Sequence, residues 1–124
     1  MGIRLLLLVT VASAIGCGVA RAECSPEHPP LTAFQSEPGT SVRGPLSIEA
    51  LERENMITIR ETGQVLPFGY AHKAWVSFKD RMKLGDSIYW FSNRNGRVYM
   101  DGHFLVRDGC VVGHLPGASV DPGR

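Results

Sequence analysis

Two turn signals divide residues 86–115 into three apolar-rich runs. The breaks fall at Asn95-Gly96 and at Asp108-Gly109. Both dipeptides favour tight hairpin turns, because a two-residue type I′ turn needs residues that tolerate a positive φ. The segment therefore predicts a three-stranded antiparallel meander.

The clearest helix is predicted just before this meander, over residues 70–84. Its apolar residues recur at helical spacing and form a single stripe: Ala74, Trp75, Phe78 and Met82. Gly85 is suited to end the helix in the left-handed conformation. We expect Trp75 and Phe78 to pack against the meander as core residues.

Weaker elements are predicted between residues 46 and 69. Ser47 is a suitable cap for a short helix over residues 47–54, which has acidic residues in its first turn. A β-branched run over residues 56–60 predicts a brief edge strand, and residues 63–69 are expected to form a connection.

Residues 23–45 are expected to form an extended arm without regular structure. The arm contains five prolines, each of which lacks a backbone donor: Pro26, Pro29, Pro30, Pro38 and Pro45. Residues 116–124 are rich in turn residues and predict a flexible tail. The fold class is thus a small α+β domain over residues 46–115, with an antiparallel sheet of three to four strands packed by one main helix and a short N-terminal helix.

Both faces of the predicted sheet carry apolar side chains. One predicted set comprises Tyr89, Phe91, Tyr99, Leu105 and Val112. The opposite set comprises Ile88, Trp90, Phe104, Val106 and Val111. Either the helix and the arm cover the two faces, or the first set is a binding surface for another chain.

The N-terminus has the pattern of an export signal. Arg4 precedes an apolar run over residues 5–15, and Ala20-Arg21-Ala22 is a small-x-small cleavage pattern. The run is too short to cross a bilayer core of roughly 30 Å as a helix. We therefore predict a signal peptide over residues 1–22 and a periplasmic or secreted protein. In the alternative, residues 14–17 resemble a bacterial lipobox, so that Cys17 carries a lipid anchor to the outer membrane.

Cleavage after residue 22 leaves two cysteines, Cys24 and Cys110. Two cysteines in an exported protein most simply pair with each other. Two free thiols and intermolecular pairing are the alternatives. We predict the Cys24–Cys110 disulfide.

Charge excludes one class of partner. The chain has 13 Lys and Arg against 12 Asp and Glu, and Arg4 and Arg21 belong to the leader. A net charge near zero gives no basic footprint for nucleic acid. No other run is apolar and long enough for a transmembrane helix.

The C-terminal third resembles a known group of proteins. The motifs are a helix with Trp75 and Phe78 that leads through Gly85-Asp86 into a strand, and a G-x-x-L-V-R-x-G hairpin over residues 102–109. They resemble a group of small uncharacterised bacterial proteins. The resemblance implies the helix-plus-meander fold and no activity. The chain differs from the group at His103, where tyrosine is usual, and at Cys110.

The second hairpin allows one candidate metal site. A regular two-residue turn at Asp108-Gly109 would pair His103 with His114 on one face, and Asp101 would share that face. Two imidazoles and a carboxylate suit zinc, copper or iron. In the alternative, Gly102 is a bulge site that turns Asp101 away, and His103 is a packing residue.

Signatures of catalysis are weak in this sequence. Cys110 beside a histidine is a candidate nucleophile, but a disulfide would consume it. Ser77, Ser87 and Ser92 lie in no G-x-S-x-G motif. We therefore predict a non-enzymatic binding module of the cell envelope, with a protein or an envelope component as partner and no cofactor. The alternatives are a metal-binding protein and a small secreted effector, inhibitor or immunity-type protein.

Overall fold

The computed structural model describes residues 23–117 and has the predicted α+β class. The predicted leader, the alternative lipidation at Cys17 and residues 118–124 of the predicted tail lie outside the described residues. No helix within residues 23–117 is both long enough and apolar enough to cross a membrane.

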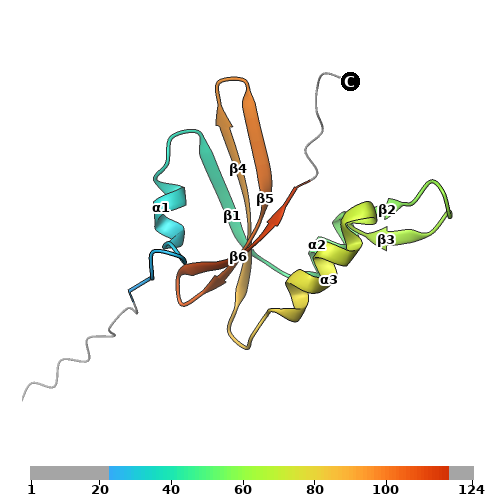
Figure 1. The fold of residues 1–124 in the computed structure, drawn as a ribbon, viewed down its shortest axis with the longest axis horizontal. Coiled ribbons are helices and arrows are strands. Elements are labelled where there is room, and N and C mark those ends of the chain that lie inside the picture. Colours follow the sequence, from blue (N-terminus) through green and yellow to red (C-terminus); the bar gives the residue numbers. More distant parts are fainter. Residues whose placement is uncertain (1–22, 118–124) are drawn as a thin grey trace, which may run out of the picture.

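The main sheet has four antiparallel strands in the order β1-β4-β5-β6 (Figure 1). They are β1 (Thr40–Leu46), β4 (Ser87–Asn95), β5 (Val98–Arg107) and β6 (Cys110–Pro116). Strands β4 to β6 form the predicted meander. The first turn lies one residue later than predicted, because Asn95 pairs with Val98 and leaves Gly96 and Arg97 as the turn residues.

The prediction of an irregular arm over residues 23–45 was wrong. The arm contains helix α1 (Leu31–Gln35) and most of strand β1, which pairs with β4. Proline is compatible with β1 because this strand lies at the sheet edge, and the pairing register shifts between Arg43 and Leu46, on either side of Pro45. The arm does run along the body of the domain, as expected.

The helical elements match the prediction in kind and differ in extent. Helix α2 (Ile48–Glu54) is capped by the Ser47 hydroxyl, which accepts from the Ala50 amide. Helix α3 (His72–Asp80) follows a short 3₁₀ turn, η1 (Gly69–Ala71), and is shorter than the predicted residues 70–84. Its end is set by the Asp86 carboxylate, which accepts from the Lys83 amide at 2.8 Å and stabilises a turn instead of another helical turn.

A second, smaller sheet lies beside these helices. The predicted strand over residues 56–60 is β2 (Met56–Thr58), and it pairs with β3 (Val65–Pro67) rather than with the main sheet. Residues 63–69, predicted as a connection, therefore include a strand. The described chain ends differently from the prediction as well: Pro116 still belongs to β6, and the Gly117 amide donates to the Asp101 carbonyl.

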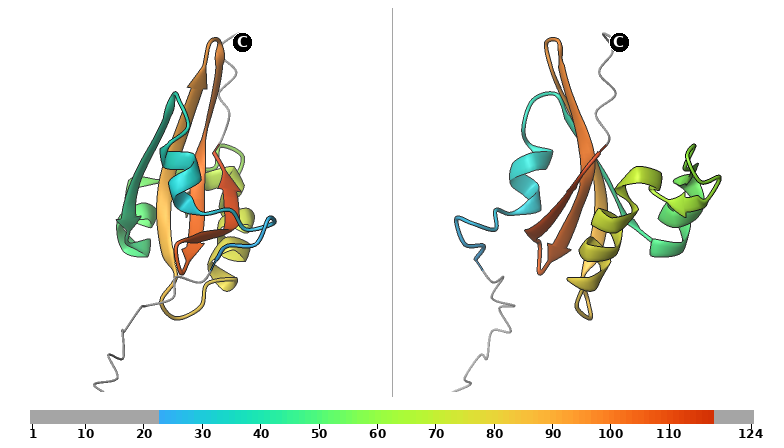
Figure 2. Two further views of the ribbon diagram at one scale, coloured as in Figure 1. Left: turned by 90° about the vertical axis from the view of Figure 1, so that its left-hand side faces the viewer. Right: turned by 45° about the vertical axis from the view of Figure 1, so that its right-hand side comes forward.

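Each face of the main sheet is covered by different helices (Figure 2). Helices α2 and α3 cover one face over a core of Leu51, Trp75, Phe78, Ile88, Leu105 and Leu115. Helix α1 lies on the other face over a core of Leu31, Phe91, Phe104, Val106 and Val111. Coverage of both faces, by the main helix and by the arm, is confirmed.

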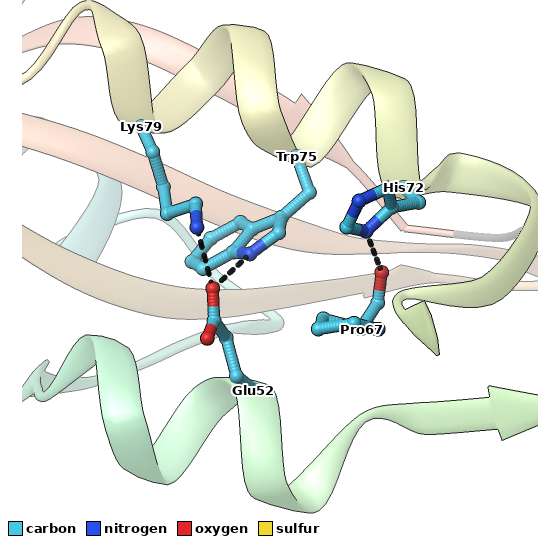
Figure 3. A network of polar contacts seen from close by, with 5 residues as sticks. All are labelled: Glu52, Pro67, His72, Trp75 and Lys79. Carbon is cyan, nitrogen blue, oxygen red and sulfur yellow. Dashed lines mark hydrogen bonds and ion pairs between the residues drawn. The ribbon is translucent and has the colours of Figure 1, made fainter. Parts of the chain in front are cut away.

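Helices α2 and α3 are joined by a shared carboxylate (Figure 3). Glu52 accepts hydrogen bonds from Trp75 Nε1 at 2.8 Å and from Lys79 Nζ at 2.6 Å. The hydrogen bond from Lys79 lowers the pKa of Glu52. At the other end of α3, His72 Nδ1 donates to the Pro67 carbonyl at 2.9 Å and holds β3 beside the helix. These contacts fix the helical layer against the small sheet.

The start of β4 is tied to the second hairpin by an ion pair. Arg107 donates from Nε and Nη2 to the two oxygens of Asp86, at 2.8 and 2.7 Å. The Asp86 side chain has no exposed surface. The hydrogen bonds from Arg107 hold the pKa of Asp86 below its ordinary value. A carboxylate stabilised in this way stabilises the folded state only while it is ionised.

We expect Asp86→Asn to lower the free energy of unfolding at pH 7 by about 2–3 kcal/mol, the range for hydrogen bonds to a charged group. In the wild type this contribution is present above the unfolded-state pKa and is lost as the pH falls below about 4. Urea unfolding at pH 7 and at pH 3 measures both effects. Asp80→Asn, at the exposed end of α3, is the matched control. Equal losses at pH 7 for the two variants would contradict the assigned role of Asp86.

Candidate functional site

A groove lies between helix α1 and the sheet face that α1 covers. Its volume is about 560 Å³. The floor is aromatic: the Phe91 and Phe104 rings stack with centroids 4.0 Å apart, and Phe34 of α1 lies 4.6 Å from Phe104. This volume falls within the roughly 300–1,000 Å³ of small-molecule sites, which are also mainly apolar. The groove is the candidate site.

The wall of the groove is held in place by the disulfide. Cys24 and Cys110 are bonded, with their Cα atoms 5.5 Å apart, so the predicted pairing is confirmed. Two backbone hydrogen bonds add to this tether: the Leu31 amide donates to the Gly109 carbonyl, and the Val111 amide donates to the Pro29 carbonyl. The start of α1 is thereby fixed to the β5–β6 hairpin, and Phe34 is placed over the sheet.

The polar residues around the groove give it acidic character. Glu27 and Glu37 line it, together with His28 and His114, and its lining contains neither lysine nor arginine. Burial lowers the pKa of His114, which favours the neutral imidazole at neutral pH. The groove therefore combines an apolar floor with two carboxylates. Such a site suits an apolar or aromatic group that carries a positive charge.

The five residues predicted as one binding surface do not share a face. Leu105 is buried in the core beneath α3, and Val112 packs against that core. Phe91 lies in the opposite core, and Tyr89 packs against it. Tyr99 pairs with Arg94 near the first turn and is about half exposed. Phe91 and Val112 line the groove, and the rest of the predicted set does not.

The predicted pairing of His103 with His114 was wrong. Arg107 pairs with Cys110 as expected, but the register shifts between Leu105 and Val106, so that His114 faces Phe104 and His103 faces Leu115. Val112 is the extra residue. Because neighbours in a strand point to opposite faces, the bulge puts the two histidines on different sides of the sheet. Among the described residues, no three His, Cys, Asp or Glu side chains are grouped closely enough to hold a metal ion.

Gly102 is not the bulge site, contrary to the alternative considered for it. It pairs regularly with Phe91 and with Pro116. A Cβ at Gly102 would collide with the Leu115 carbonyl and would lie 3.1 Å from the Phe91 ring. The absence of a side chain therefore allows β6 to approach the groove floor closely.

His103 lines a second, smaller hollow on the α2 side of the sheet. Its volume is about 320 Å³, and its lining carries charges of both signs, from Arg43, Glu54 and Asp101. The Arg43 guanidinium lies 4.8 Å from the centre of the Trp90 ring and covers that ring. Burial lowers the pKa of His103. The ring also meets Phe68 edge-on at 5.7 Å, which agrees with the packing role considered for it.

Sequence reasoning missed the residues that the arm contributes to the groove. They are Glu27, His28, Pro29, Phe34, Glu37 and Thr40. One signal was available, because Leu31 and Phe34 have the i, i+3 spacing of a helical face directly after Pro29-Pro30. Phe104 was assigned to the correct strand and to the face opposite Phe91, whereas the two rings stack.

Comparisons with known protein families, with curated proteins and with solved structures find no match for this chain. The resemblance of its C-terminal third to a group of small bacterial proteins stays a prediction.

Proposed function

We propose that this chain is an exported, non-enzymatic binding protein and that the α1 groove is its ligand site. The single observation that carries the proposal is the aromatic groove floor of Phe34, Phe91 and Phe104 next to two carboxylates. A preformed apolar groove with a few polar groups at its rim is the usual arrangement for binding a small apolar ligand. The disulfide that fixes its wall suits a protein that works outside the cytoplasm.

The ligand class follows from the lining. Apolar surface gains about 25 cal/mol for each Å² that it buries, so an apolar chain or ring is favoured in the groove. Glu27 and Glu37 favour a cation over an anion at the rim, and an aromatic floor also tolerates an organic cation. The ligand is therefore an apolar or aromatic group with a positive charge, such as a side chain of a basic peptide or an amphiphilic amine.

Three compounds that share a phenylalkyl chain and differ in charge test this proposal. They are 4-phenylbutylamine, 4-phenylbutanol and 4-phenylbutyrate, titrated into ¹⁵N-labelled protein while amide shifts are recorded. We expect the amine to bind most tightly and the carboxylate most weakly, with shifts at Thr40, Asn93, Val111 and Gly113 of the groove. We expect Glu37→Gln to weaken binding of the amine about two- to fivefold, the effect of up to about 1 kcal/mol from a partly exposed charge pair.

Two control variants test whether binding depends on the groove residues in particular. Glu49→Gln removes an equally exposed carboxylate from the first turn of α2 and should leave the affinity for the amine unchanged. Tyr70→Ala removes an exposed aromatic ring away from the groove, whereas Phe34→Ala removes part of the floor and should abolish measurable binding. Equal binding of all three compounds, or shifts spread over the α3 face, would refute the proposed site.

A further inference from the structure

The tip of the β4–β5 hairpin projects beyond the helices that cover the sheet (Figures 1 and 2). All residues from Arg94 to Met100 are exposed. Three consecutive apolar side chains follow the turn, with exposed fractions of 60% at Val98, 49% at Tyr99 and 55% at Met100. Because neighbours in a strand alternate, Val98 and Met100 lie on one face of the hairpin and Tyr99 on the other, so apolar surface is exposed on both faces of the tip.

The tip is also positively charged. Arg94 and Arg97 lie on either side of the turn, and residues 92–100 contain no acidic side chain. The first acidic residue after the tip is Asp101, whose carboxylate accepts from the Tyr99 hydroxyl at 3.4 Å. The Arg94 guanidinium lies 5.4 Å from the centre of the Tyr99 ring, which keeps cation and aromatic ring together at the surface. Basic side chains beside exposed apolar side chains and a tyrosine are the composition that binds the interface of an anionic bilayer.

The size and shape of the tip favour a lipid surface over a protein. A stable protein interface takes about 20–30 residues from each side, and the tip offers seven. A bilayer sets no such minimum, because each apolar side chain partitions and each arginine is attracted to lipid phosphates separately. A narrow protruding hairpin can enter the headgroup region while the helices on both faces of the sheet stay in water.

We propose that the β4–β5 tip docks this protein onto the surface of an anionic membrane, with Val98 and Tyr99 in the interface and Arg94 and Arg97 on lipid phosphates. None of these four residues lines the groove, although Met100 at the end of the tip does, so the proposal rests on residues outside the proposed ligand site. It is also independent of lipid attachment at Cys17, which lies far from the tip in the sequence.

Vesicle flotation tests the proposal. The full chain is produced with Cys17→Ser, which prevents lipidation at that position, and is recovered after export, with its N-terminus established by intact mass. It is mixed with vesicles of phosphatidylglycerol and phosphatidylethanolamine, or with vesicles of phosphatidylcholine alone. We expect binding to the anionic vesicles, loss of binding in high salt, and much weaker binding to the neutral vesicles.

Matched variants assign the binding to the tip. Each arginine near an anionic surface contributes about 1 kcal/mol, or roughly fivefold, so Arg94→Gln with Arg97→Gln should weaken partitioning about 30-fold. The control pair Arg53→Gln with Arg60→Gln removes the same charge from other exposed sites and should change it little.

A second pair of variants tests the apolar contribution. Val98→Ser should weaken partitioning further, whereas Val65→Ser, at the similarly exposed Val65 of β3, should not. Failure of the unmodified tip to bind anionic vesicles, or equal effects of the tip and control variants, would overturn the proposal. So would vesicle binding that persists unchanged in high salt.

Discussion

Replacement of both Cys24 and Cys110 by alanine is expected to lower the free energy of unfolding by about 4–5 kcal/mol. The two cysteines are 86 residues apart, so the bond restricts a long loop of the unfolded chain, and loop-closure entropy grows with loop length. Domains of this size are stable by only about 5–15 kcal/mol. The variant should therefore unfold at a much lower denaturant concentration, as measured by guanidinium titration followed by circular dichroism.

In the same variant, the arm that forms the groove wall should unfold under milder conditions than the main sheet. Without the disulfide, α1 is still held by Leu31 in the core, by the half-buried Phe34, by the backbone hydrogen bonds at Pro29 and Gly109 and by its contacts with β1. Amide hydrogen exchange should accelerate first in residues 24–36 and only later in β4 and β5. Under conditions where β4 and β5 stay protected, 4-phenylbutylamine should bind at least tenfold more weakly than to the wild type.

A cysteine outside the bond provides the control for this prediction. Cys17→Ala removes a sulfur atom from the predicted leader and should not change the stability of the folded domain. A change of less than about 1 kcal/mol in the double variant would show that the non-covalent contacts of α1 hold the arm without the disulfide. Unaltered exchange in residues 24–36 would contradict its role in positioning the groove wall.

The parts of the fold that could be predicted are those specified by local patterns. The meander follows from its two glycine-containing turns, since positive φ is required there and both Gly96 and Gly109 have it. Helix α3 follows from the spacing of Trp75 and Phe78, both of which are fully buried. The disulfide follows from the number of cysteines left after the predicted export signal.

The arm could not be predicted because its structure depends on distant partners. Thr40 to Arg43 become a strand by pairing with Trp90 to Asn93 of β4, about fifty residues later. Propensity alone argues against a strand between Pro38 and Pro45, and the pairing with β4 overrides that preference. The groove was missed for the same reason, since half of it comes from the arm.

The predicted metal site was wrong because of one extra residue in β6. Val112 bulges out of the β5–β6 ladder, and one extra residue reverses the face of everything beyond it. Regular alternation already places Val111 in the core under α1 and Val112 against the core under α3. The bulge acts on the residues after Val112 and turns His114 to the face of Phe104. The Asp108-Gly109 turn motif gives no sign of this extra residue.

The second large loss of stability is expected for a substitution in the core beneath α3. Trp75→Ala is expected to lower the free energy of unfolding by about 3–5 kcal/mol, the range for removal of a large buried ring. The Trp75 ring is fully buried, and its centre lies 4.5 Å from that of Phe68 and 5.8 Å from that of Phe78. Urea unfolding followed by circular dichroism measures the loss.

Two further variants serve as comparisons. One keeps an aromatic ring at position 75 without its hydrogen bond, and the other removes a different tryptophan ring. Trp75→Phe keeps most of the apolar volume and removes the donor to Glu52 with a small part of the ring, while Lys79 still pairs with Glu52, so about 1–2 kcal/mol should be lost. Trp90→Ala removes a half-buried ring that Arg43 covers at the surface, and it should cost less than Trp75→Ala. A loss from Trp90→Ala as large as that from Trp75→Ala would place the main core elsewhere than beneath α3. The fully buried Trp75 ring would then support the sheet no more than the half-buried Trp90 ring of β4.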